Sequence, residues 1–220
     1  MEHVDQIIDA LTARKQTIPQ YFTYEDVPLN ESEWLRYACI PTRDHAIVKE
    51  DPKFTASMAK ALSLISKECV FRVGFLATPL VWDQEGFPIL PFAQKSEKLR
   101  KTIEGCRYAV LFAATIGSGV DRLIRRYEKA DPQLGLLMQG LGAERVESLC
   151  DLFNAEVDAA SDSIGTATRR RYSPGYGDLP IEAQREFLPL LDAERRLGIT
   201  LSQSCLMAPS KSVTAIIGIE

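Results

Sequence analysis

The sequence has few of the residues that build metal centres. It contains only two histidines and five cysteines, and no two cysteines are closer than 30 residues. Zinc and iron–sulfur sites need several such ligands at short spacing, so this pattern argues against both. We expect no metal ligands, and cysteines that are reduced and mostly buried.

Charge and hydrophobic runs exclude two further classes. Lys and Arg number 26 against 30 Asp and Glu, which gives a net charge of −4. Because nucleic-acid binding rests on neutralising phosphates, a mildly acidic chain is a poor candidate for it. No apolar run reaches the length of about 18 residues that a membrane helix needs. The acidic N-terminus also lacks the apolar core of a secretory signal, so we predict a cytoplasmic protein with no membrane contact.

Local signatures of common enzyme classes are missing as well. Gly117 and Gly119 lie between a strand pattern and a helix pattern, but Arg122 stands where GxGxxG has its third glycine, and no P-loop follows. Neither Ser204 nor Ser210 has a G-x-S-x-G context. We predict no catalytic residue in this chain. What remains is a pocket that binds a small charged ligand beside a partner protein.

The patterns that are present predict an α+β domain. Apolar spacing and capping residues predict a short helix around Ile7 and Leu11, and further helices over 31–38, 53–67, 96–104, 120–129, 132–164 and 181–197. Strand patterns cover 69–76, 107–115, 167–172, 199–206 and 212–219, the last two as an antiparallel hairpin. We expect one largely antiparallel sheet with helices packed against it. Residues 1–30 are interpreted as a helix and an irregular arm, 31–220 as a single domain, and 77–93 as an irregular excursion.

The most informative stretch is the arginine triplet 169–171 followed by Ser-Pro-Gly-Tyr-Gly. In a strand, Arg169 and Arg171 would share one face and Arg170 would point to the other. One interpretation is a solvated charged edge that discourages aggregation. The other is an anion clamp, because a guanidinium pairs bidentately with a carboxylate. The loop that follows adds backbone N–H groups at two glycines and a tyrosine ring, which suits a small zwitterion with an aromatic base.

The same stretch resembles a known family. RYSPGY at 171–176, followed by Leu179-Pro180, resembles the Arg-x-x-Pro-Gly-Tyr segment of the activation domain of cobalamin (vitamin B12)-dependent methionine synthase. The closing stretch 198–213 is similar to that domain's Leu-Thr-Glu-Ser, Met-x-Pro and Ser-Val pattern, and 107–129 to its strand, glycine turn and helix. The resemblance covers about 100–220 well and 20–100 loosely.

The resemblance implies a fold and a role. The family fold is α+β, with a bent antiparallel sheet and a shallow groove that binds S-adenosylmethionine. The activation domain presents the methyl group to oxidised cobalamin while an external protein supplies an electron. Here the module would stand alone, as one component of a methyltransferase system. Its partner would be a cobalamin-dependent methionine synthase, or a related corrinoid protein, that lacks its own activation domain, and a flavodoxin-like protein would donate the electron.

The resemblance also implies site residues. Arg171 would hold the methionyl carboxylate of the ligand. The residues after it would shape the pocket and lend backbone contacts: Pro174, Gly175, Tyr176 and Gly177.

Two departures from the family pattern keep an alternative open. A histidine six positions after the family's tyrosine is Glu182 here, and aromatic ligand contacts after the final strand have no counterpart before Glu220. The alternative is a non-catalytic docking or redox-gating protein for a corrinoid methyltransferase that has lost S-adenosylmethionine binding. A conventional methyltransferase is disfavoured, because the sequence lacks that class's glycine-rich loop.

Overall fold

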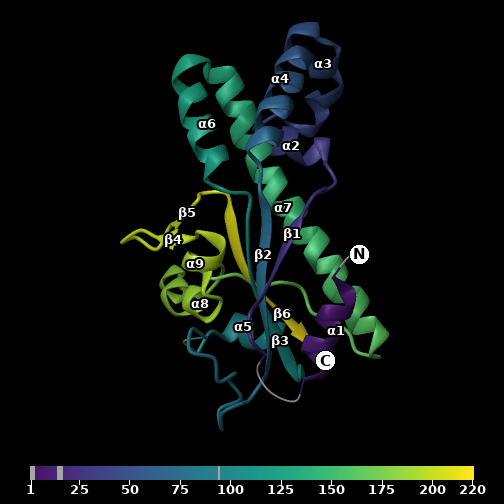
Figure 1. Cartoon of the computed structure of the whole chain (residues 1–220), viewed down its shortest axis with the longest axis vertical. Helices are drawn as coiled ribbons and strands as arrows, with labels where there is room; N and C mark the ends of the chain where they lie inside the picture. Colours follow the sequence, from purple (N-terminus) through teal and green to yellow (C-terminus); the bar gives the residue numbers. More distant parts are fainter. Residues whose placement is uncertain (1–2, 14–16, 94) are drawn as a thin grey trace.

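The fold centres on an antiparallel sheet that carries helices on both faces (Figure 1). The computed structural model describes every residue of the chain except 1–2, 14–16 and 94. The main sheet has the order β1-β2-β3-β6, and each neighbouring pair is antiparallel. Its strands are β1 (Gln20–Tyr24), β2 (Phe71–Pro79), β3 (Tyr108–Thr115) and β6 (Ser212–Ile219). The predicted α+β class is therefore confirmed.

The helices begin at the capping residues that the sequence offers. Side chains of Asn30, Asp51, Ser96 and Asp131 each accept a backbone N–H in the first turn of the helix that follows. The helices are α1 (Val4–Thr12), α2 (Glu31–Tyr37), α3 (His45–Glu50), α4 (Pro52–Glu68), α5 (Glu97–Thr102), α6 (Ser118–Ala130), α7 (Pro132–Ser163), α8 (Gln184–Leu190) and α9 (Ala193–Leu197). In the part of the chain that the structure describes, no helix is long and apolar enough to cross a membrane.

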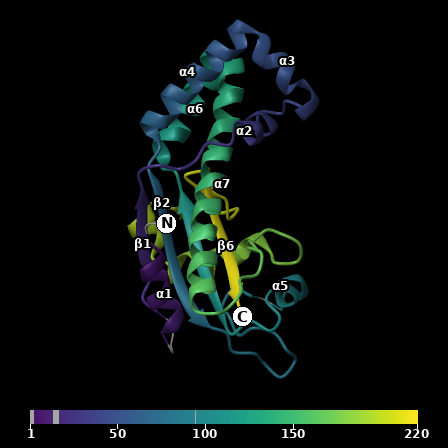
Figure 2. The same ribbon diagram turned by 90° about the vertical axis from the view of Figure 1, so that its right-hand side faces the viewer.

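Side-chain alternation along the strands divides the core in two. In β3, Val110 and Phe112 belong to the core under α1, α4 and α7, whereas Ala109 and Leu111 belong to the core under α5, α8 and α9. Successive side chains of a strand point to opposite faces, which explains why β3 is apolar throughout. Figure 2 shows α7 running along one face of this sheet.

The long helix α7 also links the sheet to a group of helices beyond it. Its N-terminal half extends past the end of the sheet and packs with α2, α4 and α6 (Figures 1 and 2). Gly140 makes the approach of α2 possible, since a Cβ there would lie 2.6 Å from the backbone nitrogen of Ala38. Trp34 of α2 donates its ring N–H to the carbonyl of Leu137, 2.8 Å away. The space between α2 and α7 becomes the candidate site.

Two sequence-based expectations near the C-terminus are wrong. The predicted hairpin of 199–206 with 212–219 does not form, because β6 pairs along its whole length with β3. Only β4 (Thr200–Leu201) and β5 (Met207–Ala208) pair with each other, as a small separate sheet. The predicted helix over 181–197 is divided into a 3-10 turn, α8 and α9, since Pro189 lies in the last turn of α8 and Asp192 adopts a left-handed φ of 45°.

The predicted strand over 167–172 is also wrong as a continuous element. Only Thr168 and Tyr172 form isolated bridges, to Ile219 and Ile216 of β6. The segment therefore touches the outer edge of β6 at separate points. The first thirty residues, expected to be a helix and an irregular arm, contain β1, which pairs with β2 across five residues.

Candidate functional site

Arg171 lies against α7, where two carboxylates hold its guanidinium. Its Nη2 lies 2.6 Å from Oε2 of Glu147, and its Nη1 lies 2.7 Å from Oδ1 of Asp151. These two acids are four residues apart on one helix, so they lie one above the other on the same face. The Arg171 side chain is 25% exposed, which leaves it within reach of a ligand. Arg169, expected on the same face, instead pairs with Glu220.

A cleft of about 220 Å³ opens at this ion-pair cluster. Asn30, Glu33 and Tyr37 line it from α2 and its cap, Arg171 closes one side, and α7 contributes Glu144, Glu147, Ser148 and Asp151. The lining thus contains four carboxylates and one guanidinium. The carboxylates outnumber the guanidinium, and an excess of one charge sign in a cleft raises the local concentration of ligands of the opposite sign.

A second, larger hollow adjoins the cleft and is more apolar. It has a volume of about 530 Å³ and shares Asn30, Ser148 and Asp151 with the cleft. Its remaining lining residues are mostly apolar: Pro28, Leu29, Glu31, Leu152 and Ala155. We call the two hollows together the α2–α7 groove. The groove therefore has a charged compartment next to an apolar one, which suits an elongated ligand with one charged end.

The carboxylates of the groove shift the pKa values of the neighbouring Arg171 and Tyr37 side chains. Burial lowers the pKa of Arg171, but the hydrogen bond to Asp151 and the nearby charge of Glu147 raise it more, so the net pKa is above the ordinary arginine value. Burial, followed by the charge of Glu147, raises the pKa of Tyr37. Arg171 therefore stays cationic, and the Tyr37 hydroxyl keeps its proton, at physiological pH.

The loop after Arg171 is held by its own hydrogen bonds. The Gly175 N–H donates to the carbonyl of Leu179 (2.9 Å), and the Tyr176 N–H donates to that of Ser173 (3.1 Å). The Tyr172 hydroxyl donates to the Tyr176 carbonyl at 2.9 Å. These two backbone N–H groups are thus used within the loop, whereas the Tyr176 ring is 70% exposed.

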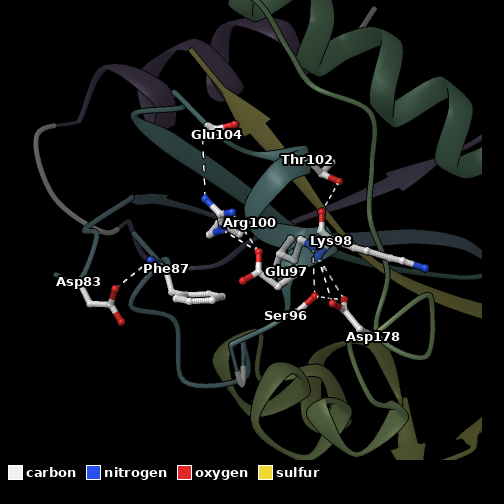
Figure 3. A network of polar contacts seen from close by, with 10 residues as sticks. Asp83, Phe87, Ser96, Glu97, Lys98, Arg100, Thr102, Glu104 and Asp178 are labelled. Atoms are coloured by element: carbon white, nitrogen blue, oxygen red, sulfur yellow. Dashed lines mark hydrogen bonds and ion pairs between the residues drawn. The ribbon is translucent and has the colours of Figure 1, made fainter. Parts of the chain in front are cut away.

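Asp178 anchors the end of this loop to α5 (Figure 3). Its carboxylate accepts hydrogen bonds from the Ser96 hydroxyl and from the Lys98 backbone N–H, the latter at 3.2 Å to Oδ2. The hydrogen bond from the Ser96 hydroxyl is the largest cause that holds the pKa of Asp178 below its usual value; burial opposes it less strongly, and backbone N–H groups, first that of Lys98, lower the pKa further. In Figure 3 the Lys98 side chain points away from this carboxylate. A helix N-terminus therefore fixes the loop.

The structure separates Arg171 from the other predicted site residues. Among the described residues that line the α2–α7 groove, Arg171 is present, but Pro174, Gly175, Tyr176 and Gly177 are not. Glu182 is exposed in the 3-10 turn Ile181–Ala183 and is also outside the groove. The assignment of these loop residues to the ligand stays a prediction.

The α7 side of the groove is not among the site residues predicted from the sequence. Glu144, Glu147, Ser148 and Asp151 follow the spacing i, i+3, i+4, i+7 and so form one polar face on a helix that is apolar elsewhere. Glu144 is only 1% exposed, and a buried acid in a helix interior requires partners. This polar face can be recognised in the sequence and would have indicated a site on this helix. In the described ranges, no cluster of His, Cys, Asp and Glu could hold a metal ion.

Fold and groove define an α+β domain with a groove between two helices in which carboxylates outnumber the one guanidinium. The sequence model for the vitamin B12 dependent methionine synthase activation domain matches residues 99–219. The match spans more than half of the chain, and the chain belongs to this family. The resemblance inferred from RYSPGY is thereby confirmed.

One solved structure supports the fold independently. The chain is similar to a crystal structure of the MetH reactivation domain bound to AdoHcy, with a TM-score of 0.65 and 14% sequence identity. The similarity covers 97% of this chain and 85% of that chain. At this identity the likeness establishes the fold alone. No curated protein matches the sequence.

Proposed function

We propose that this chain is a stand-alone activation module that binds S-adenosylmethionine in the α2–α7 groove. It would present the methyl group to the cobalamin of a partner protein. The observation that carries the proposal is the single arginine set among carboxylates in that groove. Membership of the activation domain family supports it. The partner would be a cobalamin-dependent methionine synthase or a related corrinoid protein, with a flavodoxin-like electron donor.

The charges of the groove suit this ligand. S-adenosylmethionine carries a carboxylate, an ammonium group and a sulfonium group, which gives a net charge of +1. A guanidinium has five N–H donors, of which Glu147 and Asp151 accept two, so the same group can also bind the ligand carboxylate. The carboxylates around it then attract the ammonium and the sulfonium.

The shape of the groove suits the rest of the molecule. The apolar compartment beside Pro28, Leu29 and Leu152 offers a surface for the adenosine part. The apolar compartment, at about 530 Å³, has the size of an ordinary small-molecule site, about 300 to 1,000 Å³, and the charged compartment of about 220 Å³ adds a smaller space beside it. The methionyl end would therefore lie near Arg171 and the nucleoside near α7 residue Leu152.

The contribution of the chain is placement. When bound, the sulfonium would supply an electrophilic methyl group to the reduced cobalt of the partner, and S-adenosylhomocysteine would be the leaving group. Arg171 would orient the amino-acid end, and the carboxylates of α7 would fix the sulfonium relative to it. Holding two reactants in position can supply about 7–11 kcal/mol of a barrier when the geometry is good.

Calorimetry with S-adenosylmethionine tests the proposal. Arg171→Ala should weaken binding about 10- to 150-fold, because a hydrogen bond to a charged group contributes about 1.5–3 kcal/mol. The matched control is Arg170→Ala, which removes the neighbouring, exposed arginine and should leave the affinity unchanged. Absence of saturable binding to the wild type would overturn the function, and equal affinity of Arg171→Ala and wild type would overturn the site.

A second candidate function is a docking protein that no longer binds the ligand. It is favoured by the ion pairs of Arg171 with Glu147 and Asp151, which already satisfy two of its donors, and by the internal hydrogen bond of the Gly175 N–H. Co-purification of a cobalamin protein, with no measurable S-adenosylmethionine binding to either the free chain or the complex, would select this candidate.

A further inference from the structure

A buried ion pair lies at the base of the groove, where Glu144 is also one of the residues that line the charged compartment. Arg145 and Glu144 have side chains that are 7% and 1% exposed, and Nε of Arg145 lies 2.6 Å from Oε2 of Glu144. A second hydrogen bond joins Nη2 to Oε1 at 2.8 Å. Adjacent residues of a helix do not normally face each other. Both side chains therefore bend toward a common third element, which is the segment 27–30.

The pair supplies this segment with the hydrogen bonds that it lacks. Arg145 donates to the carbonyl of Val27 at 2.8 Å and to that of Pro28 at 2.5 Å. Glu144 accepts the backbone N–H of Asn30 through Oε1 at 2.7 Å. Residues 27–30 belong to no helix or strand. Val27 is buried, and its backbone carbonyl needs a partner there, which a side chain of α7 provides in place of secondary structure.

The same segment forms the outer wall of the groove. Pro28 and Leu29 line its apolar compartment, and Asn30 lines both compartments. Asn30 also caps α2, because its side chain accepts the N–H of Glu33 at 3.2 Å. A shift of the segment would therefore move the groove wall and the start of α2 together.

We propose that Glu144 and Arg145 are positioning residues, which hold the segment Val27–Asn30 at the distance from α7 that the ligand requires. This inference rests on the proposed binding of S-adenosylmethionine. A buried ion pair is weak evidence for stability in itself, because the cost of removing both charges from water offsets their attraction. Here, however, the pair forms three hydrogen bonds to one irregular backbone segment. That arrangement fixes a geometry that an apolar pair would leave free.

The test compares Glu144→Gln with the wild type. Glutamine keeps the size of the side chain, but its NH₂ group cannot accept a hydrogen bond from Arg145, so one of the existing contacts must break. We expect at least a tenfold loss of S-adenosylmethionine affinity by calorimetry. We also expect faster hydrogen exchange of the Asn30 amide in the ligand-free protein. Arg145→Lys, which keeps the charge but cannot span both carbonyls, should act in the same direction.

The matched control is Thr214→Val on the opposite side of the sheet. Thr214 is buried and exchanges hydrogen bonds with Gln184 at 2.7 and 3.0 Å. Loss of these hydrogen bonds should lower the free energy of unfolding without changing the affinity for S-adenosylmethionine. The comparison therefore distinguishes a positioning role from a general loss of stability.

The outcomes distinguish this inference from the function on which it rests. If the wild type binds and Glu144→Gln binds equally well, the positioning role is wrong and the proposed function stands. If the wild type does not bind, the proposed function is wrong. In that case the exchange rate of the Asn30 amide decides: an equal rate in wild type and Glu144→Gln overturns the positioning role as well.

Discussion

The guanidinium of Arg171 lies 2.6 Å from the carboxylate of Glu147. Asp151, one helical turn further along α7, pairs with the same guanidinium. The only arginine that lines the described part of the charged compartment is therefore neutralised by its own surroundings. A ligand that is attracted electrostatically to this compartment must therefore carry positive charge. A simple anion clamp would instead select a negatively charged ligand.

Removing one carboxylate should change ligand selectivity. Glu147→Gln should weaken S-adenosylmethionine binding about fivefold, since a partly exposed charge pair contributes up to about 1 kcal/mol. S-adenosylhomocysteine lacks the sulfonium charge, so its affinity should change less. Asp162→Asn, which removes an exposed carboxylate near the end of the same helix, is the control. Equal losses for both ligands, measured by calorimetry, would contradict electrostatic selection.

The loop after Arg171 should tolerate no side chain at Gly177. Its φ is +62°, and a Cβ there would collide with the Tyr172 hydroxyl and lie 2.7 Å from Cδ of Lys98. Gly86 has a φ of +80° but nothing within 4 Å of such a Cβ. Gly86→Ala should therefore cost only the left-handed backbone strain, about 1–2 kcal/mol. Gly177→Ala should lower the free energy of unfolding by about 1–3 kcal/mol more, from overpacking. If urea unfolding showed the same loss of unfolding free energy for Gly177→Ala and Gly86→Ala, the loop around Gly177 would be able to rearrange without cost, and the prediction would be wrong.

The anchor at Asp178 should give the loop a dependence on pH. Its pKa is lower in the folded protein than the value of about 3.9 that an unfolded aspartate has. Its contribution to stability is therefore complete above the unfolded pKa and is lost as pH falls through the folded pKa. The difference in unfolding free energy between wild type and Asp178→Asn should be constant from about pH 5 to 7 and should shrink below about pH 4.

Ser96→Ala provides the control for this prediction. The Ser96 hydroxyl is the largest cause of the lowered pKa. In a Ser96→Ala background, the effect of Asp178→Asn should therefore depend less on pH. An unchanged pH profile would assign the stabilisation to a group other than this hydrogen bond.

Local signals predicted much of the secondary structure. The helix that begins after Asp131 and stops before Gly165 needs only a capping side chain and a glycine that accepts a φ of +72°. The alternating side chains of 212–219 predict the closing strand, which is β6. Each of these features depends on residues within a few positions of one another, so it can be read from sequence alone.

The pairing of the strands and the set of residues that line the groove could not be predicted from such local signals. The partner of β6 is β3, about 100 residues earlier, because a strand buried on both faces is stabilised more by the sheet than by a nearby hairpin partner. Pro189 and Asp192 were visible in the sequence, but whether they bend a helix or divide it depends on the packing around them. Arg171 lines the groove, but its carboxylate partners Glu147 and Asp151 could not be inferred from the motif that contains it.

The family and the α+β class could be inferred from short motifs and side-chain periodicity, and the same motifs predict Arg171 as a ligand-binding residue. That this arginine pairs with Glu147 and Asp151, and that carboxylates outnumber it in the groove, became clear only from the three-dimensional arrangement. A helix brings residues four positions apart together by its own geometry, but the approach of residue 171 to that helix depends on how the whole chain packs around the sheet.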